Sequence, residues 1–150
     1  MTPSDNPAWP DEIHNEEELD DLLTRPSEAL IHFMRTLDGD LMVLGVAGKM
    51  GLSLARLAFN AIRAAGVRRR VIGVSRFSNP QNRLELERIG VETIACDFLD
   101  RRAVDALPRC ENVIFMAGRK FGTEQDKEQT WAANTIVPIH VAEHFTGSRI

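Results

Sequence analysis

The sequence predicts an α/β protein: a doubly wound parallel sheet of strand order 3-2-1-4, extended by further strands and covered by helices on both faces in three α/β/α layers. Two observations support this prediction. Short apolar runs alternate with helical patterns from residue 41 onward. The first run leads directly into three glycines within residues 45–51, as a buried parallel strand leads into a helix. Because crossovers between parallel strands are right-handed, this alternation favours one continuous sheet.

Residues 1–40 are predicted to be an acidic helical extension that precedes the sheet. Eleven acidic and two basic side chains give this segment a net charge of −9, while residues 41–150 carry +5. Asn15 is a candidate N-cap for a helix over 16–23, because its side chain can accept a hydrogen bond from the first turn. A second helix is expected from Pro26-Ser27 onward, since apolar residues recur there at helical spacing. The extension could cover a sheet edge or mediate a subunit contact, so a homodimer is an open alternative.

The rest of the chain alternates between strand and helix patterns. The apolar runs predict four strands, over residues 41–44, 71–75, 91–96 and 112–117. Helices are expected after the glycines up to Gly66, and over 79–89, 102–107 and 128–145. A fifth strand is expected to begin near residue 147.

The three glycines have separate tasks if this loop binds the pyrophosphate of a dinucleotide. Gly45 permits a tight turn, Gly48 lets the backbone approach the ligand, and Gly51 lets the following helix pack close to the sheet. The amides around Lys49, Met50 and Gly51 are then expected to face the negative charge at the positive end of the helix dipole. This pattern predicts a Rossmann-type NAD(P) site. The alternative is a plain strand-to-helix turn.

The end of the second predicted strand indicates which dinucleotide is preferred. A carboxylate there would accept hydrogen bonds from the ribose of NAD, but the sequence has Ser75-Arg76. A guanidinium pairs well with a 2′-phosphate, and a serine hydroxyl can donate a further hydrogen bond. We therefore expect NADP to be preferred, with NAD as the alternative. Arg76 could also be an ordinary exposed side chain.

These motifs resemble the extended short-chain dehydrogenase/reductase family, the NAD-dependent epimerases and dehydratases. The glycine spacing matches the Gly-x-x-Gly-x-x-Gly of that family, and residues 97–100 are similar to its Asp-Leu-x-Asp segment. The resemblance implies that Asp97 meets the adenine amino group, that the Phe98 backbone meets the adenine ring, and that Asn134 steadies the active-site region. The residues that it places beneath the nicotinamide ribose are Met116, Ala117 and Gly118.

The resemblance also implies a reaction. Family members are oxidoreductases or isomerases, commonly of sugar nucleotides, and a Tyr-x-x-x-Lys motif moves the proton that accompanies hydride transfer. This sequence contains no tyrosine. We therefore assign no catalytic residue and expect residues 41–150 to be an NAD(P)-binding domain truncated before that motif, which binds cofactor without turnover. The alternatives are a non-enzymatic NAD(P) sensor and an interaction module that binds no nucleotide.

Other functional classes have weaker support in the sequence. His140 and His144 with Glu143 fit a His-x-x-Glu-His zinc pattern, but no third ligand follows. The one dense basic run, 68–70, has no interleaved aromatic residues, so nucleic-acid binding is not expected. Arg119 and Lys120 could approach a substrate or a cofactor phosphate, but we interpret them as solvated loop residues.

The compartment prediction follows from composition. No apolar stretch is long enough to span a membrane and the first residues form no signal peptide, so we expect a cytoplasmic protein without a membrane partner. Cys96 and Cys110 are expected to be reduced thiols, because they lack metal-ligand spacing.

Overall fold

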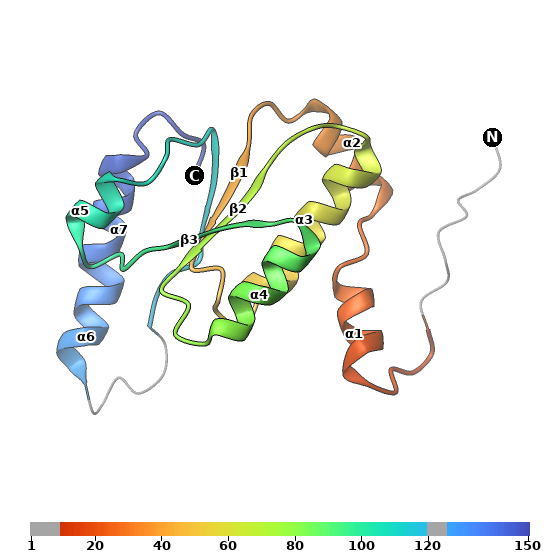
Figure 1. The fold of residues 1–150 in the computed structure, drawn as a ribbon, viewed down its shortest axis with the longest axis horizontal. Coiled ribbons are helices and arrows are strands. Elements are labelled where there is room, and N and C mark those ends of the chain that lie inside the picture. The colour runs from red at the N-terminus through yellow and green to blue at the C-terminus, as the bar shows by residue number, and fades with distance from the viewer. Residues whose placement is uncertain (1–9, 120–125) are drawn as a thin grey trace.

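The computed structural model describes residues 10–119 and 126–150, and its centre is one parallel sheet (Figure 1). The strand order is β3-β2-β1-β4. β1 lies in the middle, in parallel register with β2 on one side and β4 on the other. The strands are β1 (Leu41–Leu44), β2 (Val71–Ser75), β3 (Glu92–Ala95) and β4 (Asn112–Phe115). The predicted doubly wound order is therefore confirmed.

Helices cover both faces of this sheet (Figure 1). α2, α3 and α4 lie on one face, while α5 and α7 lie on the other. The helices are α1 (Glu16–Leu23), α2 (Glu28–Thr36), α3 (Gly51–Ala65), α4 (Pro80–Ile89), α5 (Arg101–Asp105), α6 (Lys127–Trp131) and α7 (Val137–His144), with a π-helical segment η1 (Ala132–Ile136) between α6 and α7.

Two hydrophobic cores hold the three layers together, and the pleat of β1 divides its side chains between them. Leu41 and Val43 pack with the helices α2, α3 and α4. Met42 and Leu44 pack on the other face with α5 and α7. All four side chains are buried. A strand that is apolar on both faces is what a sheet between two helical layers requires.

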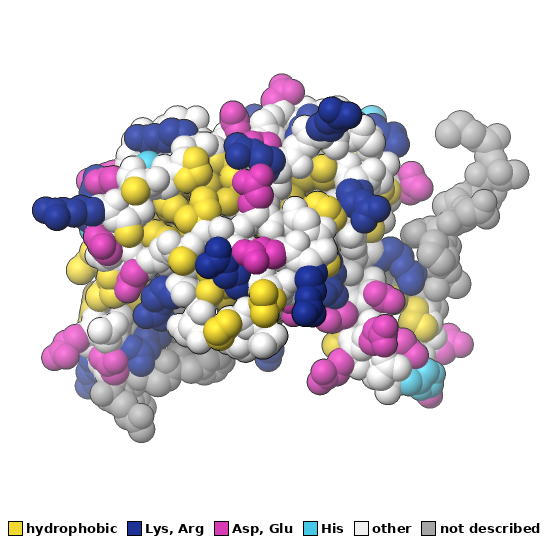
Figure 2. All heavy atoms as spheres, viewed as in Figure 1, with side chains coloured by type: hydrophobic (Ala, Val, Ile, Leu, Met, Phe, Trp, Pro, Cys, Tyr) yellow, Lys and Arg dark blue, Asp and Glu magenta, His cyan; other side chains and the backbone are white. Residues whose placement is uncertain are grey.

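The acidic extension contributes to the first of these cores. Met34 of α2 and Leu37, the C-cap of that helix, are both buried and pack in the same cluster as β1. The expected cap of α1 is present, because Asn15 Oδ1 accepts a 2.9 Å hydrogen bond from the amide of Glu18. Acidic side chains gather over α1 in the space-filling view (Figure 2). Asn60 of α3 donates through Nδ2 to the carbonyl of Thr24, the C-cap of α1, at 3.0 Å.

Several elements differ from their predicted bounds. β3 covers residues 92–95 instead of 91–96, and β4 ends at Phe115 instead of residue 117. α4 begins at Pro80 instead of residue 79, and α5 ends at Asp105 instead of residue 107. β4 ends early because Gly45 turns the neighbouring chain away with a φ of 88°, and the 2.8 Å bond from the amide of Met116 to the carbonyl of Leu44 is the last rung. α5 begins one residue early because the Asp100 carboxylate caps it.

The predicted single helix over 128–145 contains a π-helical turn. Pro138 lies in the first turn of α7. A proline has no amide hydrogen to donate, and its ring collides with the carbonyl four residues earlier, here that of Asn134. A wider turn over Ala132–Ile136 relieves this conflict. Such turns occur often at functional sites.

The two outer strands have different surroundings within the described residues. On β3, Glu92 pairs with Arg70 at 3.5 Å. On β4, Asn112 forms a parallel bridge with Arg149, whose amide donates to the carbonyl of Glu111 at 2.8 Å. Strand pairing therefore resumes close to the predicted position at residue 147. Among the described helices, none is sufficiently long and apolar to cross a bilayer.

Candidate functional site

A cleft of about 860 Å³ opens at the carboxyl ends of the strands. Ligands of open α/β sheets bind at this edge, beside the point where the strand order reverses. The structure brings most of the predicted site residues together around the cleft: Gly45, Gly48, Ser75, Arg76, Asp97, Phe98, Met116, Ala117 and Gly118. The predicted residues that do not line it are Lys49, Met50, Gly51 and Asn134.

The first and third glycines of the loop are required by packing. Gly45 has a φ of 88°, and a Cβ there would lie 2.7 Å from the amide nitrogen of Ala117. A Cβ on Gly51 would overlap the carbonyl oxygen of Val46. Gly48 is different, since a Cβ there would meet only the carbonyl of Gly45, at 3.2 Å, and the residue lines the cleft.

The hydrogen bonds of the loop show that the predicted role of the Gly51 amide in binding a ligand is wrong. The amides of Gly48 and Gly51 are not available to a ligand, because they donate to the carbonyls of Gly45 and Gly48, at 3.0 Å each. These two bonds form successive turns that bring the chain from β1 into α3. Within the described residues, the amides of Lys49 and Met50 have no protein acceptor. Of the three predicted amides, these two therefore lack an acceptor among the described residues at the positive end of α3, although neither residue lines the cleft.

Ser75 and Arg76 line the cleft where β2 ends, and Phe77 after them has an unusual backbone. Phe77 has a φ of 50°, which is rare for a bulky residue, while its side chain is 8% exposed and packs in the core with α3 and α4. The residues on either side of it, Arg76 and Ser78, both line the cleft. No local sequence pattern marks this turn, so it was not predicted.

Asp97 and Phe98 form the wall of the cleft beyond β3. Asp97 is exposed, and its Oδ1 accepts a 3.0 Å hydrogen bond from the amide of Leu99. Phe98 is buried, and its carbonyl accepts a 3.0 Å hydrogen bond from Nδ1 of His140 on α7. The backbone of this wall is thus held by one local hydrogen bond and by a second one from α7.

Asn134 lies behind the opposite wall, where it holds the backbone that follows β4. Its Oδ1 accepts from the amide of Arg119 and its Nδ2 donates to the carbonyl of the same residue, both at 2.9 Å. A Cβ on Gly118 would lie 3.1 Å from this Oδ1. The π-helical turn presents the carboxamide, so Asn134 positions the cleft wall and does not line it.

Arg119 is interpreted from the sequence as a solvated loop residue, and the structure adds an ion pair to this description. Arg119 lines the cleft, and its Nη1 donates to Oδ2 of Asp126 at 2.9 Å. Asp126 also lines the cleft and caps α6 through its other oxygen, which accepts from the amide of Gln129 at 3.2 Å. Lys120, considered together with Arg119, lies outside the described residues.

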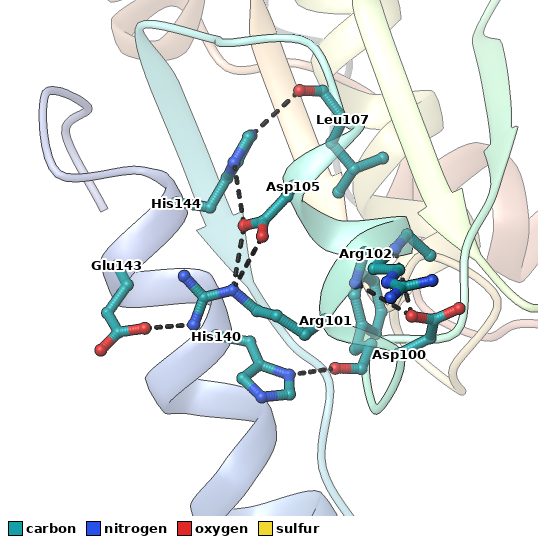
Figure 3. Close-up of polar contacts among 10 residues, drawn as sticks. Asp100, Arg101, Arg102, Asp105, Leu107, His140, Glu143 and His144 are labelled. Atoms are coloured by element: carbon teal, nitrogen blue, oxygen red, sulfur yellow. Dashed lines mark hydrogen bonds and ion pairs between the residues drawn. The ribbon is translucent and has the colours of Figure 1, made fainter.

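The three polar side chains of the His-x-x-Glu-His pattern lie on α7 and bind groups of neighbouring segments of the protein (Figure 3). His140 donates to the carbonyl of Phe98, while Nε2 of His144 donates to the carbonyl of Leu107 at 3.0 Å. Glu143 pairs with Arg101 of α5. In the described part of the chain, no three potential ligands are grouped closely enough to hold a metal ion.

The buried cysteines are held in their neutral forms. Burial raises the pKa of Cys96 to about 11, and the charges of Asp97 and Asp100 act in the same direction. Burial also raises the pKa of Cys110. A thiol with a raised pKa is a poor nucleophile, so neither cysteine has the environment of a reactive one.

Comparison with solved structures supports the same fold. A protein described as a putative short-chain oxidoreductase, TTHB094 from Thermus thermophilus, is 18% identical with a TM-score of 0.56, over 73% of this chain and 55% of its own. The dehydrogenase Cj0485 is 13% identical with a TM-score of 0.57, over 75% of this chain and 47% of its own. The chain thus spans about half the length of these structures and has their Rossmann-like fold. No family model and no curated protein matches the sequence.

Proposed function

We propose that this chain binds NADP(H) in the cleft, with NAD(H) as the weaker ligand, as the cofactor-binding portion of an oxidoreductase of the epimerase/dehydratase type. The observation that carries the proposal is that Gly48 and Arg76 line one cleft at the carboxyl ends of the strands, beside the start of α3. A helix N-terminus and a guanidinium beside one cleft suit a ligand with several phosphates.

The residues present fit such a cofactor. Gly48 has no side chain, so the backbone at the mouth of α3 can approach a diphosphate closely. Arg76 and Ser75 would hold a 2′-phosphate at the end of β2, and the exposed Asp97 would meet the adenine amino group. A bound nicotinamide supplies hydride transfer, and Met116, Ala117 and Gly118 would form the wall beside it.

The substrate would be a small molecule, a sugar or sugar nucleotide according to the resemblance in the sequence. These 150 residues include no tyrosine, so they lack the residue that moves the proton in the family that the sequence resembles. We infer that the residues described here bind and orient the cofactor without turnover. The same observation favours a second candidate, a sensor that binds NADP(H) without catalysis.

Equilibrium titration with NADPH, followed by the fluorescence of the nicotinamide, tests the site. Gly48→Asp would place a carboxylate where we locate the diphosphate, and the affinity for NADPH should fall at least about tenfold. Gly147→Asp is the matched control, because it adds the same charge where no atom lies within 4 Å of a new Cβ. Equal affinity of all three proteins would refute the site, as would a wild-type protein that does not bind NADPH.

The sensor can be distinguished from the cofactor portion of an enzyme by its preference for one redox state. A sensor of the NADPH/NADP⁺ ratio must bind the two forms with different affinities, since the bound form would otherwise only follow the ratio in solution. The cofactor portion of an enzyme has no such requirement. Equal affinities in titrations with both forms, with equal hydrogen exchange of the backbone amides as a second readout, would reject the redox sensor.

A further inference from the structure

Arg119 is held in a fixed place on the wall of the cleft that follows β4. Both polar groups of its backbone bond to the Asn134 carboxamide at 2.9 Å. The neighbouring Gly118 approaches Asn134 closely enough that a Cβ would lie 3.1 Å from Oδ1. The side chain of Arg119 therefore begins from a backbone that cannot shift without the loss of these contacts.

The guanidinium of Arg119 is oriented by one ion pair within the described residues. Its Nη1 donates to Asp126 at 2.9 Å, and Asp126 is itself fixed as the cap of α6. The two side chains are 35% and 38% exposed. A guanidinium has five N–H donors, and the structure records no second acceptor for this one among residues 10–119 and 126–150. By contrast, Arg101 of α5 pairs with two carboxylates, Asp105 and Glu143.

The strand order places Arg119 opposite Arg76, with the glycine loop between them. Arg76 follows β2 and Arg119 follows β4, while β1, which leads into the loop, lies between these strands. The wall that carries Arg119 touches the loop directly, because a Cβ on Gly45 would lie 2.7 Å from the amide nitrogen of Ala117. A ligand that extends from Arg76 past the loop therefore reaches Arg119 with its other half.

We infer that Arg119 binds the phosphate on the nicotinamide side of the dinucleotide, while Arg76 binds the adenosine side. This inference rests on the proposed function. The loop contributes neutral amides to the diphosphate, and Arg119 contributes a positive charge with donors that have no acceptor among residues 10–119 and 126–150. Asp126 keeps the guanidinium turned toward the cleft, and Asn134 keeps its backbone in place. Arg119 is thus a binding residue for one half of the cofactor.

The experiment compares NADPH with adenosine 2′,5′-bisphosphate, which lacks the nicotinamide half, by calorimetric titration. Arg119→Gln should weaken NADPH binding about tenfold, the loss expected for one charge-assisted contact, and should leave the bisphosphate within about twofold of wild type. Arg76→Gln is the matched comparison and should weaken both ligands. Arg119→Lys keeps the positive charge and should recover most of the loss.

Each result has a definite consequence. Equal losses for the two ligands in Arg119→Gln, or no loss for either, would overturn the inference while leaving the proposed function intact. A lysine variant as weak as the glutamine variant would also overturn it, since the contact would then not depend on charge. Failure of the wild-type chain to bind NADPH would instead reject the proposed function. Melting temperatures verify folding and should stay close to that of the wild type, because an exposed ion pair contributes little to stability.

Discussion

Glycine spacing alone does not distinguish the three glycines of the loop, but their surroundings do. Gly45 and Gly51 lie against backbone atoms of the protein itself. Gly48 lies at the cleft, where its missing side chain leaves room for a ligand. Substitutions at these positions should therefore separate effects on folding from effects on binding.

Gly51→Ala should destabilise the protein by about 3 kcal/mol, because the new methyl group would overlap the Val46 carbonyl and neither backbone segment can move easily. Urea unfolding measures the loss. The wild type and the variant are compared with the same slope of the free energy of unfolding against urea concentration. Gly147→Ala is the control and should change the free energy of unfolding by less than about 0.5 kcal/mol, since its surroundings are open. If the urea midpoint of Gly51→Ala equals that of the wild type, the close approach of α3 to Val46 is not required.

Arg76→Asp should shift cofactor preference from NADPH toward NADH. A carboxylate repels a 2′-phosphate and can accept hydrogen bonds from a free ribose. The affinity for NADPH should fall about 10- to 100-fold, with a smaller change for NADH. Fluorescence titrations with both cofactors measure the ratio, and Arg68→Asp, at a position away from the cleft lining, is the control. Equal losses for NADPH and NADH would remove the assignment of Arg76 to the 2′-phosphate.

At the scale of elements, α7 connects the cleft wall to the second core. His140 holds the carbonyl of Phe98 and His144 that of Leu107, so one helix fixes both ends of the segment around α5 (Figure 3). The π-helical turn at the start of this helix presents Asn134 to the other wall. The helix therefore determines the positions of both walls of the cleft.

Packing of α7 against α5 should weaken in mild acid because of His144. Burial lowers the pKa of His144, and Arg109 and Arg101 act in the same direction, while the Leu107 carbonyl and Asp105 oppose them. Below the ordinary histidine value of about 6.5, the unfolded chain takes up a proton that the folded chain resists. The stability contributed by the neutral ring is therefore present at pH 7 and above and is lost as the pH falls.

Urea unfolding between about pH 7.5 and 5 measures this effect in the wild type and in His144→Gln, whose amide can still donate to the Leu107 carbonyl. Wild-type stability should fall more steeply, with an extra slope of at most about 1.4 kcal/mol per pH unit, the limit for one proton. Other titrating groups act equally in both proteins and cancel in the difference. Parallel curves would show that His144 does not resist protonation.

For the whole molecule, the alternation of apolar runs and helical patterns was sufficient to predict the sheet order. The cap Asn15 was also visible, because it acts within a few residues of the helix that it begins. Arg119 and Phe77 were not, since their roles depend on contacts made only after folding. Arg119 is paired across residues 120–125 and clamped from another helix, and the backbone of Phe77 is compensated by burial of its ring.

Cofactor binding should stabilise the entire fold, because the cleft exists only when the sheet is assembled. At a hundred times its dissociation constant, NADPH should contribute about 2.7 kcal/mol and raise the melting temperature by about 5–10 °C for a chain of this size. Thermal unfolding with and without NADPH tests this. The melting temperature of Gly48→Asp should rise much less at the same NADPH concentration. An equal rise would indicate that NADPH binds elsewhere.

The charged outer strand has a consequence for how copies of the molecule meet at high concentration. β3 has only four residues and places Glu92 beside Arg70, so another chain that approached this edge would have to desolvate an ion pair to add its own backbone. Intermolecular strand addition is thereby disfavoured at β3. Any lengthening of the sheet is directed to the side of β4, where Arg149 already occupies the first pairing position.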